Sequence, residues 1–200
     1  AFHAKVRDPK AVKVSVFYEA ECPQSRDFIH KQLWPHWLDL EEGIKLELVP
    51  YGKANHTQVD GHWEFMCHRG ESECLANKLH ACVIKKLHNH VTKMLRVIKC
   101  LMTKKDQLAG LPECLNELFL KHETEKYLEC VHSPDTDDLF VKHGDRTHKM
   151  FKTLDTLPKI VFNDKHQKRN NAQALNEFTK IVCRYIGQIC SERIDLPVLY

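Results

Sequence analysis

Apolar positions in the first fifty residues follow a strand, helix, strand order. Residues Val12–Tyr18 are rich in valine and aromatic side chains, which is typical of a buried strand. Pro23 stands where a helix often takes its first residue, and apolar residues then recur near helical spacing at Phe28, Ile29, Leu33, Trp37 and Leu40. Pro35 predicts that this helix bends or ends early. Residues Ile44–Val49 alternate apolar with charged side chains, which predicts a second strand and a βαβ start.

The next hundred residues predict helices. Amphipathic helical patterns run over Leu75–Cys82, Val83–Cys100 and Pro112–Cys130, the last of which opens on a proline suited to a first helical turn. Six of the nine cysteines lie between residues 67 and 130. We therefore expect a disulfide-rich helical insertion over about residues 60–150. The turn-forming stretch Ser133–Asp138 is expected to return the chain toward the sheet.

A third strand and a last helix complete the pattern. Residues Thr156–Asp164 predict a strand that contains Pro158 near its start, a polar turn follows, and Ala172–Cys190 predicts a helix with one apolar side. The order of elements is that of an α/β, three-layer, thioredoxin-like fold with a large disulfide-rich helical insertion. We expect residues 1–200 to form a single domain.

Composition restricts the class of protein. The chain is 42% hydrophobic and 28% charged, and it contains no run of 18 apolar residues, so we expect a soluble globular protein without a transmembrane segment. The first ten residues lack the apolar core of a signal peptide, and any such peptide is expected to have been removed. The net charge is +3 with the 14 histidines neutral, and we interpret most of these histidines as ordinary surface residues.

Nine cysteines are compatible with disulfides in an oxidising compartment or with a metal site in the cytosol. Zinc sites usually have gaps of two residues between cysteine ligands, but six residues separate the closest cysteines here, so disulfides are favoured. His62 and His68 flank Cys67, but we expect no metal there because Cys67 is expected in a disulfide. Asn55 opens a glycosylation acceptor, which agrees with secretion. Because nine is odd, at least one thiol stays free or bonds another molecule.

Cys22 is the candidate reactive thiol. It follows a predicted strand and precedes a predicted helix, where unpaired backbone N–H groups and the helix dipole stabilise a thiolate. In a Cys-x-x-Cys site the second thiol, one helical turn later, resolves the mixed disulfide. Here that position holds Ser25, whose hydroxyl cannot exchange with disulfides but can donate a hydrogen bond to the Cys22 thiolate. The pattern favours an accessible lone thiol, and the alternative is a ninth cysteine in a helix cap without a redox role.

Pro158 is the second candidate site residue. In thioredoxin-like folds the proline that opens this strand is usually cis and lies beside the active cysteine, where the preceding backbone pairs with an extended substrate. The alternative is a simple loop proline. The basic stretch Lys165–Arg169 suits anionic ligands or a solvated turn equally well, and we expect no nucleic-acid partner.

The stretch Cys67–Cys82, with sequence CHRGESECLANKLHAC, resembles the signature C-Q-H-G-x2-E-C-x2-N-x4-C of the gamma-interferon-inducible lysosomal thiol reductase (GILT) family. Six positions match: Cys67, Gly70, Glu73, Cys74, Asn77 and Cys82. His68 and Arg69 depart from the Gln-His pair of that signature.

The resemblance implies a thioredoxin-like fold, glycosylation, secretion or lysosomal delivery, and reduction of protein disulfides at acidic pH. It also implies a Cys-x-x-Cys pair. Cys22 matches the first cysteine of that pair, whereas Ser25 stands at the position of the second. Eight cysteines remain for structural disulfides, with their pairing open: Cys67, Cys74, Cys82, Cys100, Cys114, Cys130, Cys183 and Cys190.

Two functions from different classes follow. In one, a monothiol disulfide reductase attacks a protein disulfide with Cys22, Pro158 helps to hold the substrate, and an external small thiol completes the cycle at acidic pH without any other cofactor. In the other, a secreted, lysosomal or endosomal scaffold has lost dithiol turnover and acts by binding a protein partner. We favour the second, because the resolving sulfur is missing while the eight structural cysteines remain. A dimer linked through Cys22 is a third hypothesis.

Overall fold

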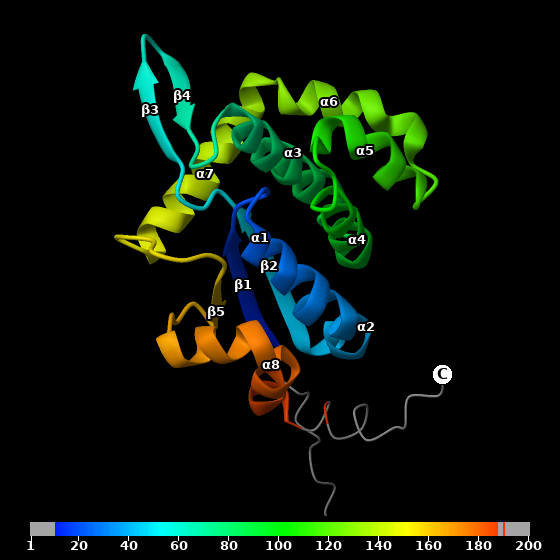
Figure 1. Ribbon diagram of the computed structural model, residues 1–200, viewed down its shortest axis with the longest axis vertical. Helices are drawn as coiled ribbons and strands as arrows, with labels where there is room; N and C mark the ends of the chain where they lie inside the picture. The colour runs from blue at the N-terminus through cyan, green and yellow to red at the C-terminus, as the bar shows by residue number, and fades with distance from the viewer. Residues whose placement is uncertain (1–10, 188–189, 191–200) are drawn as a thin grey trace, which may run out of the picture.

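A three-stranded sheet of order β2-β1-β5 forms the base of the fold. The computed structural model describes residues 11–187 and residue 190 (Figure 1). Strand β1, Val12–Tyr18, pairs in parallel with β2, Ile44–Pro50, and antiparallel with β5, Lys159–Phe162. Val16 of β1 lies opposite Leu48 of β2 and Ile160 of β5. The three predicted strands and the βαβ start are therefore confirmed.

The connection from β1 to β2 is an interrupted helix, as Pro35 predicts. Helix α1, Pro23–Phe28, continues into a π-helical turn η1, Ile29–Leu33, and a 3-10 turn η2, Trp34–His36. Helix α2, Trp37–Leu40, and the 3-10 turn η3, Glu41–Gly43, then lead into β2. Because Pro35 has no N–H to donate, regular α-helical bonding cannot run through this position.

Helices cover both faces of the sheet. On one face, Val14 and Val16 of β1 belong to the large core, together with Phe28 of α1 and Phe178 of the last helix. That helix is α8, Lys168–Ile186, which begins four residues before the predicted Ala172. On the other face, Phe17 meets Phe151 with ring centroids 5.1 Å apart, just after helix α7, Pro134–Met150. Alternating side chains of one strand thus reach two helical layers.

The insertion is mostly helical, with boundaries that differ from the prediction. It contains α3, Glu71–Leu87; α4, Val91–Leu101; α5, Gln107–Asn116; the 3-10 turn η4, Lys121–Glu123; α6, Thr124–Val131; and α7. Pro112 lies inside α5, so its assignment to a first helical turn was wrong; the cap of α5 is Asp106, whose carboxylate accepts from the Ala109 N–H.

Ser133–Asp138 does not return the chain to the sheet. Ser133 caps α7 by accepting the Asp135 N–H, and Pro134 occupies the first helical position. The turn-forming residues that suggested a loop are therefore the start signal of a seventeen-residue helix. The chain returns to the sheet only after α7 ends at Met150.

A hairpin that was not among the predicted elements precedes the helices. Strands β3, Asn55–Val59, and β4, His62–Met66, pair antiparallel and project from the molecule beside α7 (Figure 1). The Trp63 Nε1 donates to Asp138 Oδ1 at 2.9 Å, and Phe65 packs against Phe140 with ring centroids 4.9 Å apart. Local signals for this hairpin are present: Asp60 and Gly61 form a two-residue turn with positive φ at both residues, and Trp63 and Phe65 alternate with more exposed residues along β4.

Four disulfides use the eight cysteines predicted to be structural. They join Cys67 to Cys74, Cys82 to Cys130, Cys100 to Cys114, and Cys183 to Cys190. Three of them lie within the insertion, and the fourth lies at the end of α8. Cys22 is the free cysteine.

Candidate functional site

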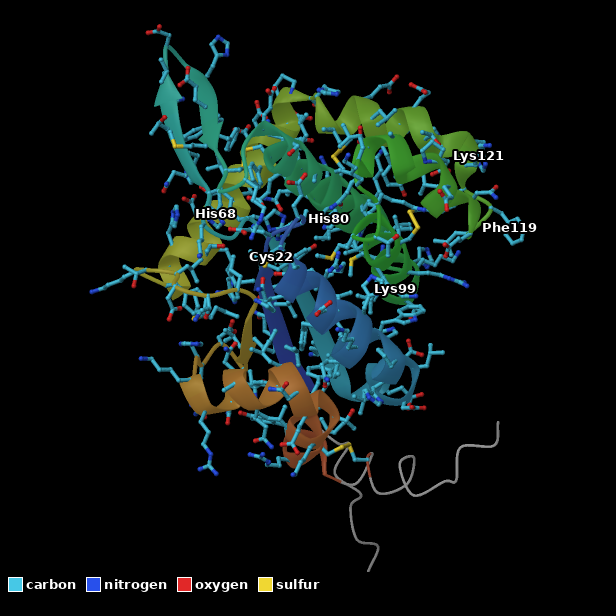
Figure 2. All side chains as sticks on the ribbon, viewed as in Figure 1. Cys22, His68, His80, Lys99, Phe119 and Lys121 are labelled. Atoms are coloured by element: carbon cyan, nitrogen blue, oxygen red, sulfur yellow. A yellow bond between two sulfur atoms is a disulfide. The ribbon has the colours of Figure 1, made fainter. Side chains whose placement is uncertain are left out.

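Cys22 occupies the N-cap position of α1, four residues after the end of β1 (Figure 2). Its carbonyl accepts the Arg26 N–H at 3.0 Å, which is the first bond of the helix. Its sulfur lies 3.3 Å from Gln24 Oε1, to which the thiol donates. The residue is only 4% exposed, so the expectation of an accessible thiol was wrong.

Ser25 lies one helical turn after Cys22 and is fully buried. Its hydroxyl has no hydrogen-bond partner, so the expected bond from Ser25 to the Cys22 sulfur is not formed. A buried hydroxyl without a partner carries an unfavourable desolvation free energy. The hydroxyl therefore neither replaces the resolving thiol nor stabilises a thiolate at Cys22.

The loop that carries Cys22 is held by buried polar side chains of the insertion. Asn77 of α3 accepts the Ala20 N–H at 2.9 Å, and Gln107 of α5 donates to the Ala20 carbonyl at 2.9 Å. All three residues are at most 4% exposed. Both backbone groups of Ala20 thus find partners on helices that are distant in the sequence. The insertion thereby determines the path of the chain just before the thiol.

His80 extends this network to the sheet. Because the Gln107 amide group donates to Ala20, its Oε1 faces His80 and accepts the Nε2–H at 2.8 Å. The other ring nitrogen, Nδ1, then accepts from the Tyr18 hydroxyl at 3.0 Å. Burial lowers the pKa of His80 to about 4, although the bond to Gln107 opposes this shift. His80 is therefore a neutral structural residue below the thiol loop.

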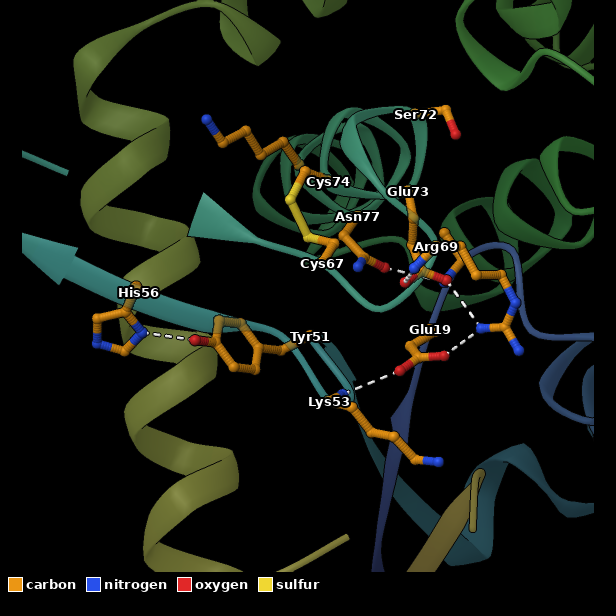
Figure 3. Close-up of a disulfide and its surroundings, with 12 residues drawn as sticks. Glu19, Tyr51, Lys53, His56, Cys67, Arg69, Ser72, Glu73, Cys74 and Asn77 are labelled. Carbon is orange, nitrogen blue, oxygen red and sulfur yellow. Dashed lines mark hydrogen bonds and ion pairs between the residues drawn. A yellow bond between two sulfur atoms is a disulfide. The ribbon is translucent and has the colours of Figure 1, made fainter. Parts of the chain in front are cut away.

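A buried ion-pair cluster adjoins the same loop and includes Glu73, one helical turn before Asn77 on α3 (Figure 3). Arg69 Nη1 pairs with Glu19 Oε2 and, at 3.0 Å, with Glu73 Oε2. The two carboxylates are 1% exposed and Arg69 is 32% exposed. Glu19 also accepts the Lys53 N–H at 2.9 Å, and His68 Nδ1 lies 3.5 Å from its Oε2. One guanidinium thus compensates two buried carboxylates beside the residues that precede Cys22.

Glu73 is the carboxylate of this cluster whose pKa is raised. Burial raises the pKa of Glu73, the nearby charge of Glu19 raises it further, and Arg69 opposes both. The Cys67–Cys74 disulfide closes the loop that carries Arg69, and Glu73 immediately precedes Cys74 on α3. The disulfide and the ion pairs therefore fix the same short segment against the thiol loop.

A pocket of about 310 Å³ opens beside Cys22. Four cationic side chains line it: Arg26 of α1, Arg69 of the loop before α3, and Lys104 and Lys105 of the loop before α5. Glu21 is the acidic residue of this lining. The buried thiol therefore borders a cavity lined by four cationic side chains and one carboxylate, an excess of cations that favours an anionic ligand.

Pro158 immediately precedes β5 and follows a cis peptide bond from Leu157. The next residue, Lys159, pairs with Phe17 of β1. Pro158 therefore lies at the end of the sheet from which the chain continues to Cys22. Asn55, the predicted glycosylation acceptor, is exposed at the start of β3.

A family model described as gamma interferon inducible lysosomal thiol reductase (GILT) matches residues 13–118, more than half of the 200 residues. The matched range includes Cys22, the signature segment and Gln107. The chain belongs to the GILT family. The GILT-like protein of Anopheles gambiae is 30% identical over 197 residues, which cover 93% of this chain and 81% of the relative. The mouse lysosomal thiol reductase is 31% identical over 191 residues, which cover 93% of this chain and 74% of that protein.

Solved structures show the same fold at low sequence identity. The thiol-disulfide oxidoreductase MdbA of Actinomyces oris superposes with a TM-score of 0.58 at 16% identity, covering 87% of this chain and 80% of that protein. DsbA of Chlamydia trachomatis gives a TM-score of 0.56 at 18% identity, covering 88% of each chain. The thioredoxin-like, disulfide-rich α/β fold is thereby confirmed.

The GILT signature gains a physical explanation from the contacts above. Its asparagine, Asn77, binds the backbone of the thiol loop, and its glutamate, Glu73, binds Arg69. Arg69 stands where the signature has histidine, so this departure supplies a permanent cation to the two buried carboxylates. The sequence pattern marked Glu73 and Asn77 but contained no signal for Glu19, Gln107 or His80, because their partners come from distant segments.

Proposed function

We propose that this GILT-family protein lacks dithiol reductase turnover and acts by binding a protein partner at the surface around Cys22. The observation that carries the proposal is the buried, unpartnered Ser25 hydroxyl at the position of the resolving thiol. The remaining eight cysteines of the chain are all paired in disulfides, so none of them offers a free thiol to Cys22. A mixed disulfide formed at Cys22 would persist until an outside thiol released it.

The proposed location is the secretory pathway, either outside the cell or in lysosomes or endosomes after removal of a signal peptide. Four disulfides support an oxidising compartment. The relatives from goldfish and mouse are named lysosomal thiol reductases. The exposed Asn55 would carry a glycan in that pathway. None of the helices among the described residues is long and apolar enough to cross a membrane.

A monothiol reductase is the second candidate, because Cys22 lines a cationic pocket at a helix N-terminus. In that reaction the Cys22 thiolate attacks a substrate disulfide, one substrate sulfur leaves as a thiolate, and the other stays bonded to Cys22. An external small thiol then attacks the mixed disulfide and regenerates Cys22. A second small thiol frees the remaining substrate sulfur, so two small thiols are oxidised to their disulfide while one substrate disulfide is reduced.

Reduction of insulin separates the two functions. We would measure it at acidic and neutral pH, with and without excess free cysteine, for the wild type and for Cys22→Ala, Ser25→Cys and Ser25→Ala. The wild type and Ser25→Ala are expected to show no multiple turnover, whereas Ser25→Cys is expected to gain partial activity because it restores the second thiol. Thiol-dependent turnover by the wild type that is absent from Cys22→Ala would establish the monothiol reductase and refute the binding proposal.

A dimer linked through Cys22 is tested separately. Because the Cys22 residue is 4% exposed, we expect a monomer on a non-reducing gel. A dimer band that disappears on reduction and in Cys22→Ser would show that the sulfur becomes exposed in solution.

A further inference from the structure

A second pocket adjoins the one at Cys22 and differs from it in chemistry. It has a volume of about 390 Å³ and lies between the start of α3 and the start of α5. The two pockets share four lining residues: Glu21, Ser72, Lys105 and Gln107. Leu75 and Leu108 contribute apolar wall to the second pocket only. Together the two pockets form a groove, here called the Cys22 groove, with a cationic end and an apolar end.

The floor of the Cys22 groove is preorganised. Gln107 is 4% exposed and held by Ala20 and His80, so its position does not depend on a ligand. Ser72 Oγ donates to Glu21 Oε2 at 3.2 Å where the two pockets meet. A ligand therefore meets a fixed polar group at Gln107, which needs no reorganisation on binding.

The cations differ in how far they are already neutralised. Arg69 is paired with two carboxylates, and Lys104 Nζ lies 2.6 Å from Glu113. Arg26 lies 3.8 Å from Asp27, at the limit of an ion pair. Lys105 is exposed and makes no ion pair with any of the described residues, and it lines both pockets. Two carboxylates also line the groove: Glu21 accepts from Ser72, and Asp106 accepts the Ala109 N–H as the cap of α5. The Lys105 ammonium group, which is shared by the two pockets, is thus available to an anion.

We propose that the Cys22 groove binds an acidic, extended segment of a protein partner, with a carboxylate at Lys105 and a neighbouring apolar side chain between Leu75 and Leu108. This inference rests on the proposed binding function and specifies its partner. Charge complementarity selects an acidic segment at one end, and the adjoining apolar wall selects a segment that is long enough to present a hydrophobic residue. A free small anion would satisfy only the cationic end.

Binding of short fluorescein-labelled peptides, followed by fluorescence anisotropy, tests the groove. The test peptide carries three glutamates followed by two leucines; in one control lysines replace the glutamates, and in another serines replace the leucines. All proteins carry Cys22→Ala, so that no disulfide contributes. The matched protein variants are Lys105→Glu, Lys105→Arg and Lys121→Glu, because Lys121 is an exposed lysine at the far end of the insertion (Figure 2).

The acidic peptide is expected to bind the Cys22→Ala protein, and both control peptides are expected to bind at least about fivefold more weakly. Lys105→Glu should weaken the acidic peptide about five- to tenfold, whereas Lys105→Arg and Lys121→Glu should leave its affinity nearly unchanged. Higher salt should reduce the binding, since the contact at Lys105 is exposed.

Several results would overturn the groove proposal. They are equal effects of Lys105→Glu and Lys121→Glu, equal affinity for the serine-substituted peptide, and absence of peptide binding. Binding of free phosphate or glutathione that depends on Lys105, without peptide binding, would replace the groove proposal with a small-anion site. The insulin assay is independent: thiol-dependent turnover there refutes the proposed function, while a negative peptide result with no turnover refutes the groove alone.

Discussion

Replacement of Arg69 by methionine tests whether one guanidinium compensates two buried carboxylates. The change keeps most of the side-chain volume but removes the cation from Glu19 and Glu73, each of which is 1% exposed. Breaking a buried ion pair by removing one partner costs about 3–5 kcal/mol. Because Arg69 is itself 32% exposed, we expect the lower end, a loss of about 3 kcal/mol in the free energy of unfolding near neutral pH.

The loss should depend on pH with a defined sign. In the folded protein the pKa of Glu73 is raised, so the folded state binds this proton more tightly than the unfolded chain. The contribution of Glu73 to stability is therefore present in acid and is lost as the pH rises through its folded pKa. Removing Arg69 raises that pKa further, so the variant should lose about 1–2 kcal/mol less at about pH 5 than at about pH 7.

Urea denaturation with intact disulfides, followed by far-UV circular dichroism, measures these differences. Arg96→Met is the matched control, because Arg96 and its partner Glu117 are 50% and 47% exposed at 3.6 Å, and we expect a loss below about 1 kcal/mol. The double variant Arg69→Met with Glu73→Gln should recover part of the stability, since it leaves one buried charge instead of two. Equal losses for Arg69→Met and Arg96→Met, or a loss that is independent of pH, would refute the reasoning.

Further predictions concern His80 and the disulfides. Because burial depresses the pKa of His80 to about 4, the unfolded chain binds this proton first, and stability should fall as the pH drops below the ordinary value of about 6.5. In the His80→Gln variant, the free energy of unfolding from urea titrations should fall less with decreasing pH, by up to about 3 kcal/mol in total. The same fall with pH in the variant and the wild type would contradict a buried, neutral His80. Replacing Cys82 and Cys130 by alanine should cost about 4 kcal/mol because their disulfide spans 48 residues, whereas the same change at Cys67 and Cys74, seven residues apart, should cost about 2.4 kcal/mol. The reverse order of the two losses in thermal unfolding would refute this chain-entropy argument.

Local sequence features predicted most of the secondary structure. Valine and aromatic residues marked β1, and Pro35 marked the interruption between α1 and α2, because both signals act on the backbone of their own segment. The same local reasoning was wrong at Ser133–Asp138, where turn residues are also the residues that cap helices. It missed β3 and β4, although Asp60-Gly61 between them is typical of a two-residue hairpin turn and Trp63 and Phe65 alternate with more exposed residues along β4.

The amino-acid sequence by itself determined the kinds of chemistry present at the site: a single unpaired cysteine at a helix start, a serine in place of its resolving partner, and the signature residues Glu73 and Asn77. Only the tertiary structure decided that Cys22 is buried and that Arg69 joins two carboxylates. The reason is physical: caps and periodic patterns act within one segment, whereas desolvation, ion pairing and the shape of a groove arise from segments that meet only in the folded chain.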